Sequence, residues 1–297
     1  MEQKLITIIT PVYNRAHLIG DLYESIKTQI NQNFIWMIVD DGSKDEIASV
    51  VEQFQKEGKI PIVFLQKENG GKHTALNMAF SHIDTELTII VDSDDKLTPE
   101  ATELIECTWK TEKEPDIAGC VFLKGNTEGE CIGHSDLKNG KYNMIDAMFS
   151  HKIDGDKAEV FRCDILRKYR FPVYENEKFI GEDYIWRQIY LNYRMIYRND
   201  IIYTCEYLEG GLTKQGRKLR IRCPLGGMAN SKVSLCKEFP ARERIKRAWL
   251  YVCYGKFAGK KYHDIVNGDT NKNLLRVNYL PGLMLYFYWN KKYGKSV

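Results

Sequence analysis

The first hundred residues alternate between two hydrophobic patterns. Short apolar, largely β-branched runs at 5–10, 34–39, 62–65 and 87–91 predict buried strands. Between these runs, apolar residues recur at helical spacing over 18–30, 47–54 and 74–80, which predicts helices with one buried face. Thr98, Pro99 and Glu100 predict the start of another helix, with a capping hydroxyl, a proline at the first position and an acid near the positive end. This alternation predicts an α/β fold, a mostly parallel sheet with helices on both faces.

The pattern is less regular after residue 100. Apolar stretches predict strands at 117–123, 158–161 and 195–207 and a helix at 183–190. Residues 237–257 predict a basic amphipathic helix in which Ile245 and Leu250 lie among cations. We expect one α/β domain over 1–222 and a basic, aromatic, mainly helical region over 223–297.

Composition narrows the class of protein. The chain has 297 residues, of which 43% are hydrophobic and 28% charged, so it is long and apolar enough to be globular. From Lys237 onward there are 13 Lys and Arg but only four Asp and Glu, a balance of +9, against −6 for residues 1–236. The two parts therefore face different environments or partners.

The cysteines and the apolar runs indicate the compartment. The eight cysteines form no C-x-x-C pair and no cluster with histidine, which argues against a zinc module and a disulfide scaffold. The first apolar run stops at Pro11, short of the apolar stretch of a signal peptide. No window reaches the roughly 18 apolar residues of a membrane span. We expect a reducing, cytoplasmic setting without a membrane span, and the basic region is compatible with a membrane surface.

The loops that follow the predicted strands carry the candidate chemistry. In parallel sheets, ligands bind outside the carboxyl ends of the strands. These ends fall at 11–14, 40–43, 69–72 and 92–95, with the sequences PVYN, DDGS, NGGK and DSDD. Anionic and tight-turning residues at this density are more than a purely structural loop needs.

Asp92 and Asp94 lie two residues apart after a predicted strand, with Asp95 next to them. Alternate residues of an extended backbone point to one side, so the two carboxylates can converge on a hard cation such as Mg²⁺ or Mn²⁺. Such a cation would neutralise a diphosphate. The alternative is a solvated acidic turn that caps the following helix.

Tyr13 and Asp41 follow the first two predicted strands. A tyrosine ring can stack on a flat base, and an aspartate can accept a hydrogen bond from a ring N–H. The glycine-rich loop at 69–72 lets backbone approach a phosphate while Lys72 supplies charge, but it matches neither the P-loop nor the dinucleotide fingerprint. Structural turns are the alternative interpretation of both loops.

Two further segments carry candidate groups. Glu182 and Asp183 open an aromatic helix, where a carboxylate can take a proton from an alcohol or can simply complement the helix dipole. The glycines and cations of 208–222 predict a mobile lid that grips phosphate, or else a solvated basic loop.

Taken together and in this order, the motifs resemble a family 2 glycosyltransferase with the GT-A fold. The resemblance covers roughly residues 4–190, and its specificity lies in the combination of ITIITPVYN (6–14), VDDGS (39–43), NGGKHTALNMA (69–79), VDSDD (91–95) and GEDY (181–184). It implies a nucleotide-sugar donor, usually a UDP-sugar, a divalent metal, and inverting transfer to an acceptor hydroxyl.

The resemblance also implies roles for single residues. Asp94 would bind the metal, with Asp95 as a reserve ligand. Asp183 would be the catalytic base, with Glu182 as the second candidate. The nucleotide-sugar would be bound by residues of the four loops and, by a looser match, by the lid: Pro11, Tyr13, Asn14, Asp41, Lys72, Asn77, Asp92, Ser93, Lys214 and Arg217.

The chain lacks the Q-x-x-R-W motif of processive synthases in that family, so we expect addition of single sugars. The acceptor would be a glycan or a lipid-linked saccharide in capsule, exopolysaccharide or wall-glycan synthesis, reached from an anionic membrane surface. The basic aromatic region alternatively mediates assembly into a homo-oligomer, and no feature indicates nucleic-acid binding. Rival hypotheses are a non-catalytic nucleotide- or glycan-binding module of the same fold and a sugar nucleotidyltransferase, which should instead carry a glycine-rich loop after the first strand.

Overall fold

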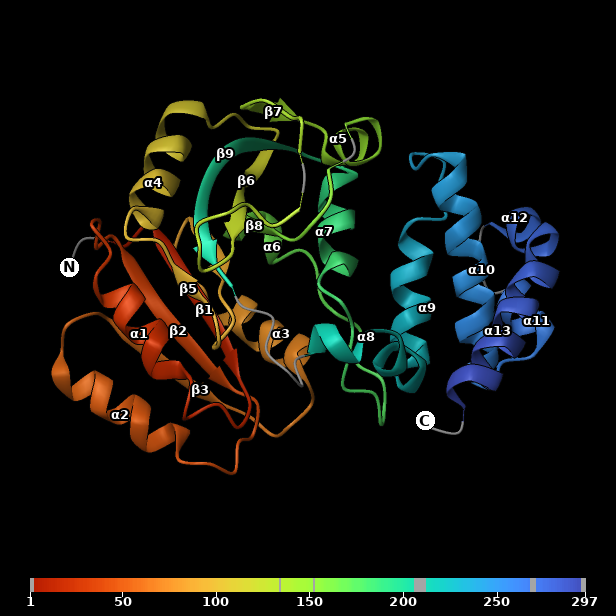
Figure 1. Ribbon diagram of the computed structural model, residues 1–297, viewed down its shortest axis with the longest axis horizontal. Coiled ribbons are helices and arrows are strands. Elements are labelled where there is room, and N and C mark those ends of the chain that lie inside the picture. The colour runs from red at the N-terminus through yellow and green to blue at the C-terminus, as the bar shows by residue number, and fades with distance from the viewer. Residues whose placement is uncertain (1–2, 134, 152, 206–211, 268–270, 295–297) are drawn as a thin grey trace. The chain divides into compact units, whose positions relative to one another are not determined.

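A computed structural model describes residues 3–133, 135–151, 153–205, 212–267 and 271–294, with the side chains of 212–215 left out (Figure 1). The chain divides into two compact units, one formed by 1–170 and 192–206 and the other by 171–191 and 207–297. This division differs from the boundary expected at residue 222, because 171–191 group with the C-terminal helices. The assignment of catalysis to 1–222 stays a prediction.

The first unit is built on one mixed sheet with the strand order β3-β2-β1-β4-β8-β6-β9-β5. Its parallel half confirms the four predicted strands, β1 (Ile6–Val12), β2 (Phe34–Asp40), β3 (Ile62–Gln66) and β4 (Leu87–Ile90). The other half comprises β5 (Lys96–Leu97), β6 (Ile117–Gly125), β7 (Gly140–Tyr142), β8 (Lys157–Arg162) and β9 (Arg194–Thr204). Strand β8 runs antiparallel to both β4 and β6, and β9 runs parallel to β6.

Six helices of this unit are described: α1 (Ile19–Lys27), α2 (Ile47–Glu57), α3 (Lys72–His82), α4 (Ala101–Glu112), α5 (Met144–Ser150) and α6 (Cys163–Leu166). Every residue of β1 is buried, which explains its unbroken apolar sequence, since parallel strands are covered on both faces. The apolar faces of α1, α2 and α4 join Ile6, Ile8 and Trp36 in one core.

The predicted cap of α4 is wrong in its detail. The helix begins at Ala101, and Pro99 and Glu100 form a turn before it. The Thr98 hydroxyl is buried and makes no hydrogen bond within the described part of the chain, so it does not cap the helix. Instead, the amide Oε1 of Gln29 accepts a hydrogen bond of 3.0 Å from the backbone N of Thr102. A side chain distant in sequence therefore supplies the acceptor that the first turn needs.

The second unit is helical throughout its described segments of regular structure. Its helices are α7 (Asp183–Tyr190), α8 (Leu212–Arg222), α9 (Pro224–Val233), α10 (Ala241–Phe257), α11 (Tyr262–Asn267), α12 (Lys272–Val277) and α13 (Tyr279–Tyr293). Val252, Cys253, Leu275 and Trp289 are among the residues of the core that α8 to α13 share. None of the described helices is both long and apolar enough to cross a membrane.

The segment expected to be a mobile loop is partly helical. Residues 212–222 form α8, which is kinked at Gly216, where φ is 44° and ψ is −110°. Residues 208–211 of the expected lid lie outside the described part of the chain. The long side chains of 217–222 have ordinary helix propensity, so their charge alone did not make this segment a loop.

Candidate active site

The carboxyl ends of β1 and β2 bring the first two motifs together. The strands pair in parallel from Ile6–Phe34 to Val12–Asp40, and Pro11 is buried within β1. The backbone N of Asn14 donates to Ser43 Oγ at 2.8 Å, and Asn14 Oδ1 accepts from the backbone N of Lys44 at 2.8 Å. Tyr13 is left with 44% of its surface exposed, as a ring that stacks on a ligand must be.

Asp41 organises the glycine-rich loop. Its buried carboxylate accepts hydrogen bonds from Lys67 Nζ (2.7 Å), Asn69 Nδ2 (3.0 Å) and the backbone N of Gly70 (3.0 Å) and Gly71 (2.6 Å). A carboxylate has about four lone-pair positions, and these four donors occupy them. The predicted contact of Asp41 with a base would therefore compete with this loop, and it stays a prediction.

Gly42 makes the close approach of these two loops possible. Its φ of 77° is unfavourable for other residues, and a Cβ built there would lie 2.7 Å from the backbone N of Asn69. The D-D-G-S turn is thus structural at its glycine, whatever its aspartates bind.

The acidic turn after β4 faces cations from three other segments. Lys72, the first residue of α3, places Nζ 2.5 Å from Asp92 Oδ1. Burial would raise the pKa of Asp92, but the charges of Lys72, Lys124 and Arg15 outweigh burial and lower that pKa. Asp92 is thereby held ionised, as a hydrogen-bond acceptor for a ribose or sugar hydroxyl would be.

Asp94 and Asp95 differ in their surroundings. The Asp94 carboxylate is 22% exposed and lies 3.9 Å from Arg15 Nη1. Asp95 is buried and accepts a hydrogen bond of 2.6 Å from the hydroxyl of Tyr203 on β9. Burial raises the pKa of Asp95 to about 7, the Tyr203 hydrogen bond opposes this rise, and the charge of Asp92 adds to it. Asp94 is therefore the better placed of the two to bind a cation, and Ser93, between Asp92 and Asp94, is buried.

The acidic turn fits Mg²⁺ or Mn²⁺, provided that substrate and water complete the coordination of the ion. Within the residues that the structure describes, no three His, Cys, Asp or Glu side chains converge. Mg²⁺ needs only one or two protein carboxylates when phosphate oxygens and water fill its other positions. The partly exposed Asp94 carboxylate, with only a long ion pair to Arg15, meets that requirement.

Sequence reasoning missed several charged or polar residues of this site. Arg15 directly follows the PVYN motif and was visible in the sequence, as was Lys67 beside the glycine-rich loop. No sequence motif points to Lys124 and Tyr203. These two residues come together because β6 and β9 pair with them in register. Asn77 lies on α3, and its main-chain O accepts a hydrogen bond from Arg170.

A cavity of about 440 Å³ lies elsewhere in this unit. Its lining includes Glu86, which immediately precedes β4, and Arg162, the last residue of the antiparallel strand β8. It therefore opens where β4 begins, at the edge opposite the four motif loops, and is separate from the candidate site.

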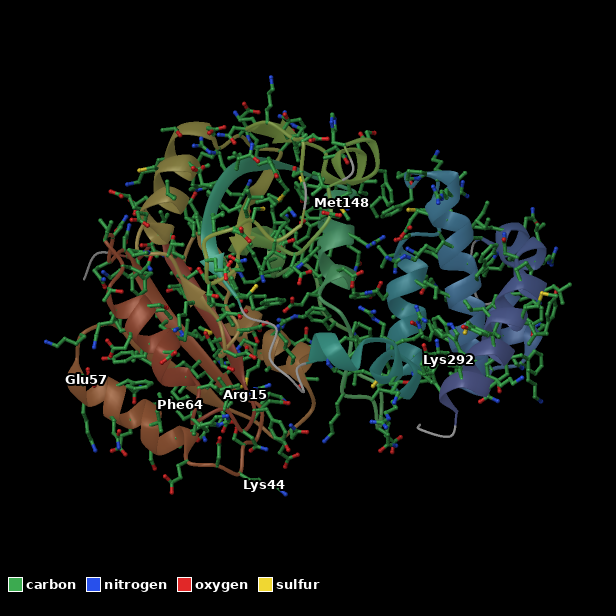
Figure 2. The ribbon with its side chains drawn as sticks, in the orientation of Figure 1. Arg15, Lys44, Glu57, Phe64, Met148 and Lys292 are labelled. Atoms are coloured by element: carbon green, nitrogen blue, oxygen red, sulfur yellow. The ribbon has the colours of Figure 1, made fainter. Side chains whose placement is uncertain are left out.

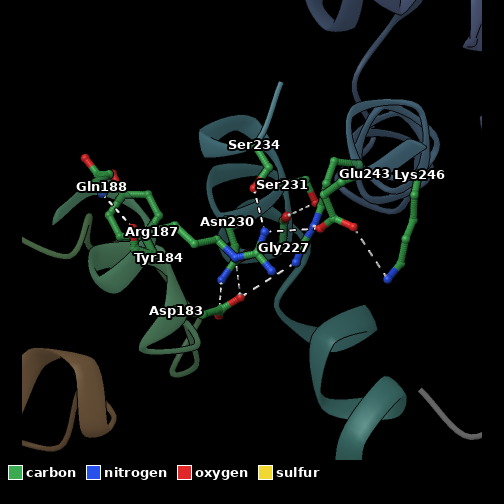
Figure 3. A network of polar contacts seen from close by, with 11 residues as sticks. Asp183, Tyr184, Arg187, Gln188, Gly227, Asn230, Ser231, Ser234, Glu243 and Lys246 are labelled. Atoms are coloured by element: carbon green, nitrogen blue, oxygen red, sulfur yellow. Dashed lines mark hydrogen bonds and ion pairs between the residues drawn. The ribbon is translucent and has the colours of Figure 1, made fainter. Parts of the chain in front are cut away.

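The predicted base lies in the second unit, at the start of α7. Asp183 Oδ1 accepts a hydrogen bond from Asn230 Nδ2, and its Oδ2 lies 3.4 Å from Arg187 Nε and 3.9 Å from Arg247 Nη2 (Figure 3). Its side chain is still 44% exposed. Glu182 immediately precedes the helix, and its main-chain O accepts from the backbone N of Ile185 at 2.9 Å.

Buried charges hold this carboxylate in place. Arg187 Nη1 donates to Ser234 Oγ (2.8 Å) and pairs with Glu243 Oε1 (3.1 Å), which also accepts from Arg247 Nε (2.6 Å). Burial would raise the pKa of Glu243, but its hydrogen bond and ion pairs with the arginines lower it. Burial, with the charge of Arg247, lowers the pKa of Arg187. This network ties α7 to α9 and α10 and fixes the position of Asp183.

Of the two residues assigned to the lid, Lys214 and Arg217, the structure describes only the side chain of Arg217. The side chain of Lys214 lies outside the described residues. The Arg217 guanidinium lies 4.8 Å from the centroid of the Trp289 ring and donates to Tyr293 Oη at 3.3 Å. In this structure Arg217 therefore contacts α13, and its binding to a nucleotide stays a prediction.

The sheet order and the acidic strand-end loops define the GT-A fold, and solved structures share it. TarS 1–349 of S. aureus in complex with UDP-GlcNAc has a TM-score of 0.65 and 17% identity, covering 95% of this chain and 80% of that chain. The mannosyltransferase PcManGT from Pyrobaculum calidifontis, in complex with GDP-Man and Mn²⁺, has a TM-score of 0.59 and 19% identity, covering 95% and 88%.

Residues 7–176 match the model described as Glycosyl transferase family 2, and the chain belongs to this family. It is 26% identical over 227 residues to the glycosyltransferase GlyA of Streptococcus pneumoniae, across 70% of this chain and 31% of that protein. It is 28% identical over 192 residues to the GalNAc(5)-diNAcBac-PP-undecaprenol beta-1,3-glucosyltransferase of Campylobacter jejuni, across 62% and 59%. The matches thus span less than two thirds of these relatives.

Proposed function

We propose that this chain transfers one sugar from a nucleotide-sugar, a UDP-sugar, to an acceptor hydroxyl with inversion at the anomeric carbon. The observation that carries the proposal is the convergence of Tyr13, Lys72, Asp92 and Asp94 at the carboxyl edge of the parallel strands. An exposed ring, a glycine-rich turn and a charged acidic turn suit the base, the diphosphate and the sugar of one ligand. The UDP and UDP-GlcNAc complexes of TarS support a uridine nucleotide.

The mechanism follows from the placement of charge. As the bond from the anomeric carbon to the diphosphate oxygen breaks, negative charge grows on the diphosphate and positive charge on the sugar. Lys72 and Arg15 supply fixed positive charge beside the acidic turn, where it stabilises the leaving group without reorganisation. Asp183 takes the proton from the attacking hydroxyl, and attack from the opposite face inverts the configuration.

We propose Mg²⁺ or Mn²⁺ as the cofactor, held by Asp94 with Asp95 as the reserve ligand. When bound, the ion supplies Lewis-acid stabilisation of the departing diphosphate. The Mn²⁺ complex of PcManGT, which has a similar fold, supports this choice. The hydrogen bond from Tyr203 goes to Asp95 Oδ2, so Asp95 would bind a cation through its other oxygen, Oδ1.

We propose a lipid-linked saccharide or glycan as the acceptor, in capsule, exopolysaccharide or wall-glycan assembly at the cytoplasmic face of the plasma membrane. The name of the Campylobacter jejuni relative, which includes an undecaprenyl diphosphate saccharide, supports a lipid-linked acceptor. The basic helical region from Lys237 onward suits the surface on which such an acceptor lies.

A donor screen tests the proposal. The chain is incubated with UDP-, GDP- and dTDP-sugars, and hydrolysis is followed by release of the nucleoside diphosphate, first without and then with an undecaprenyl-linked saccharide. We expect turnover with a UDP-sugar and faster release with the acceptor. Binding of UDP without turnover of any donor would instead identify a non-catalytic binding module. Release of diphosphate from a nucleoside triphosphate plus sugar phosphate would identify a nucleotidyltransferase.

A further inference from the structure

Helix α13 is apolar on two opposite faces. Its inner face packs into the core of the second unit through the buried Gly282 and Trp289. A Cβ at Gly282 would lie 2.6 Å from Val252 Cβ, so α13 and α10 approach closely at this glycine. The burial of the inner face is therefore already satisfied within the unit.

The outer face of α13 carries large apolar side chains without cover. Leu280, Met284, Phe287 and Tyr288 are 60%, 63%, 60% and 56% exposed, and Val277 at the end of α12 is 79% exposed. At about 100° per residue, positions 280, 284, 287 and 288 fall within one arc of roughly 100°. We call these five residues the outer apolar face. Exposed apolar patches of this kind mark interaction surfaces.

Cations flank this face at both ends. Lys272 and Arg276 lie on α12, and Lys291 and Lys292 lie in the last turns of α13, where Figure 2 labels Lys292. All four are exposed, and the sequence from 271 to 294 contains no Asp or Glu. The face is thus an apolar strip on a segment, 271–294, whose charged side chains are all cationic.

We propose that the outer apolar face of α12 and α13 inserts into the interface of an anionic lipid membrane. A helix with exposed apolar and aromatic residues beside lysines lies in the plane of such an interface, with its apolar side among the acyl chains. The cations meet anionic headgroups, and Tyr288 suits the headgroup level. A second copy of the chain fits less well, because a two-fold contact would bring the lysines and Arg276 of both copies together, and 271–294 contains no acid to oppose them.

This inference rests on the membrane location given in the proposed function and deepens it, and vesicle binding tests it without any sugar transfer. It also specifies which residues of α12 and α13 touch lipid. Loss of vesicle binding with normal donor hydrolysis would overturn this inference alone, and the reverse result would overturn the proposed function alone.

Co-sedimentation with vesicles tests the apolar part. The full chain is spun with vesicles of phosphatidylcholine alone and with vesicles that also contain phosphatidylglycerol. We expect binding to the anionic vesicles, and Met284→Ser/Phe287→Ser should weaken it by about tenfold because two large side chains no longer leave water. Ile30→Ser, which changes a residue 59% exposed in the first unit, is the matched control and should bind as wild type.

Charge reversal tests the electrostatic part. Lys291→Glu/Lys292→Glu should weaken binding to anionic vesicles, and added salt should weaken the wild type in the same way. Lys59→Glu/Lys138→Glu, an exposed pair in the first unit, controls for net charge and should bind as wild type. Thermal melting confirms that all variants are folded.

Three results would overturn the proposal. They are failure of the wild type to pellet with anionic vesicles at low salt, equal binding of the patch variants and their controls, and a wild-type dimer that Met284→Ser/Phe287→Ser converts to a monomer. The last result would identify a second copy as the occupant of the face.

Discussion

Lys124 lies over the ring of Tyr203, with its Nζ 3.9 Å from the ring centroid. The two residues are partners in register on the parallel strands β6 and β9. The Tyr203 hydroxyl donates to Asp95 and accepts from the backbone N of Asp92 at 3.0 Å. The Tyr203 hydroxyl therefore fixes the backbone of the acidic turn, and Lys124 brings a positive charge to it from β6.

The first prediction concerns this charge. Lys124→Met should raise the KM for the UDP-sugar about tenfold, because a cation near the diphosphate site is lost from a partly buried position. Lys124→Arg retains the charge and the contact with the ring and should lie close to wild type. Steady-state kinetics with the best donor measure both variants, with the exposed Lys138→Met as the control. An unchanged KM in Lys124→Met would show that this lysine only supports Tyr203.

The second prediction concerns the cation. Asp94→Ala should lower transfer by at least about 10²-fold, since the enzyme can no longer hold the cation that neutralises the departing diphosphate. The fold should survive, because this carboxylate is partly exposed and its ion pair with Arg15 is long, at 3.9 Å. Activity is measured with Mg²⁺, with Mn²⁺ and in excess EDTA, and thermal melting checks the fold.

Asp156→Ala provides the matched control for this change, since Asp156 is an exposed aspartate of the same unit. It should retain full activity. Normal turnover of Asp94→Ala, or of wild type in EDTA, would show that the diphosphate is neutralised by Lys72 and Arg15 rather than by a metal.

The sequence was sufficient for the parallel half of the sheet and for the places of its loops. Unbroken apolar strands and amphipathic helices have distinct periods, and parallel strands must deliver their carboxyl ends to one edge. Asp92 and Lys72 were therefore both assigned to the site before their 2.5 Å contact was seen.

The rest depended on contacts that no local pattern encodes. The Asp41 carboxylate accepts hydrogen bonds from a loop some thirty residues away in the sequence. The Tyr203 hydroxyl donates to Asp95, from which it is separated by 108 positions. Gln29 caps a helix that begins 72 residues later, which is why the expected cap at Thr98 failed. The helical state of 212–222 was missed because a run of cations was interpreted as a loop.

The third prediction concerns the base. Asp183→Asn should lower kcat by roughly 10² to 10⁴ while leaving UDP affinity nearly unchanged. An asparagine has the same shape, and its Oδ1 can still accept from Asn230, but it cannot take a proton. Single-turnover transfer to an acceptor measures the chemical step, and Glu182→Gln is the matched comparison. A full loss in Glu182→Gln with normal turnover in Asp183→Asn would move the role of base to Glu182.

The last prediction concerns His73, a buried residue of α3 beside the glycine-rich loop. Burial lowers the pKa of its imidazole, the charge of Asp41 opposes this, and Lys67 adds to it. The native state therefore binds a proton on His73 only at a lower pH than the unfolded chain, which binds it near pH 6.5. Its contribution to stability is complete above about pH 6.5 and is lost as the pH falls from there toward the lower native pKa.

The free energy of unfolding should therefore fall between about pH 7.5 and pH 5.5, by at most about 1.4 kcal/mol per pH unit from this one group. Urea titrations at both pH values measure the change in wild type and in His73→Asn, which does not titrate there. The variant should lose less stability over this range than wild type, even if it is less stable throughout. His17→Asn changes an exposed histidine and should retain the wild-type slope. Equal slopes for wild type and His73→Asn would show that other groups cause the acid sensitivity.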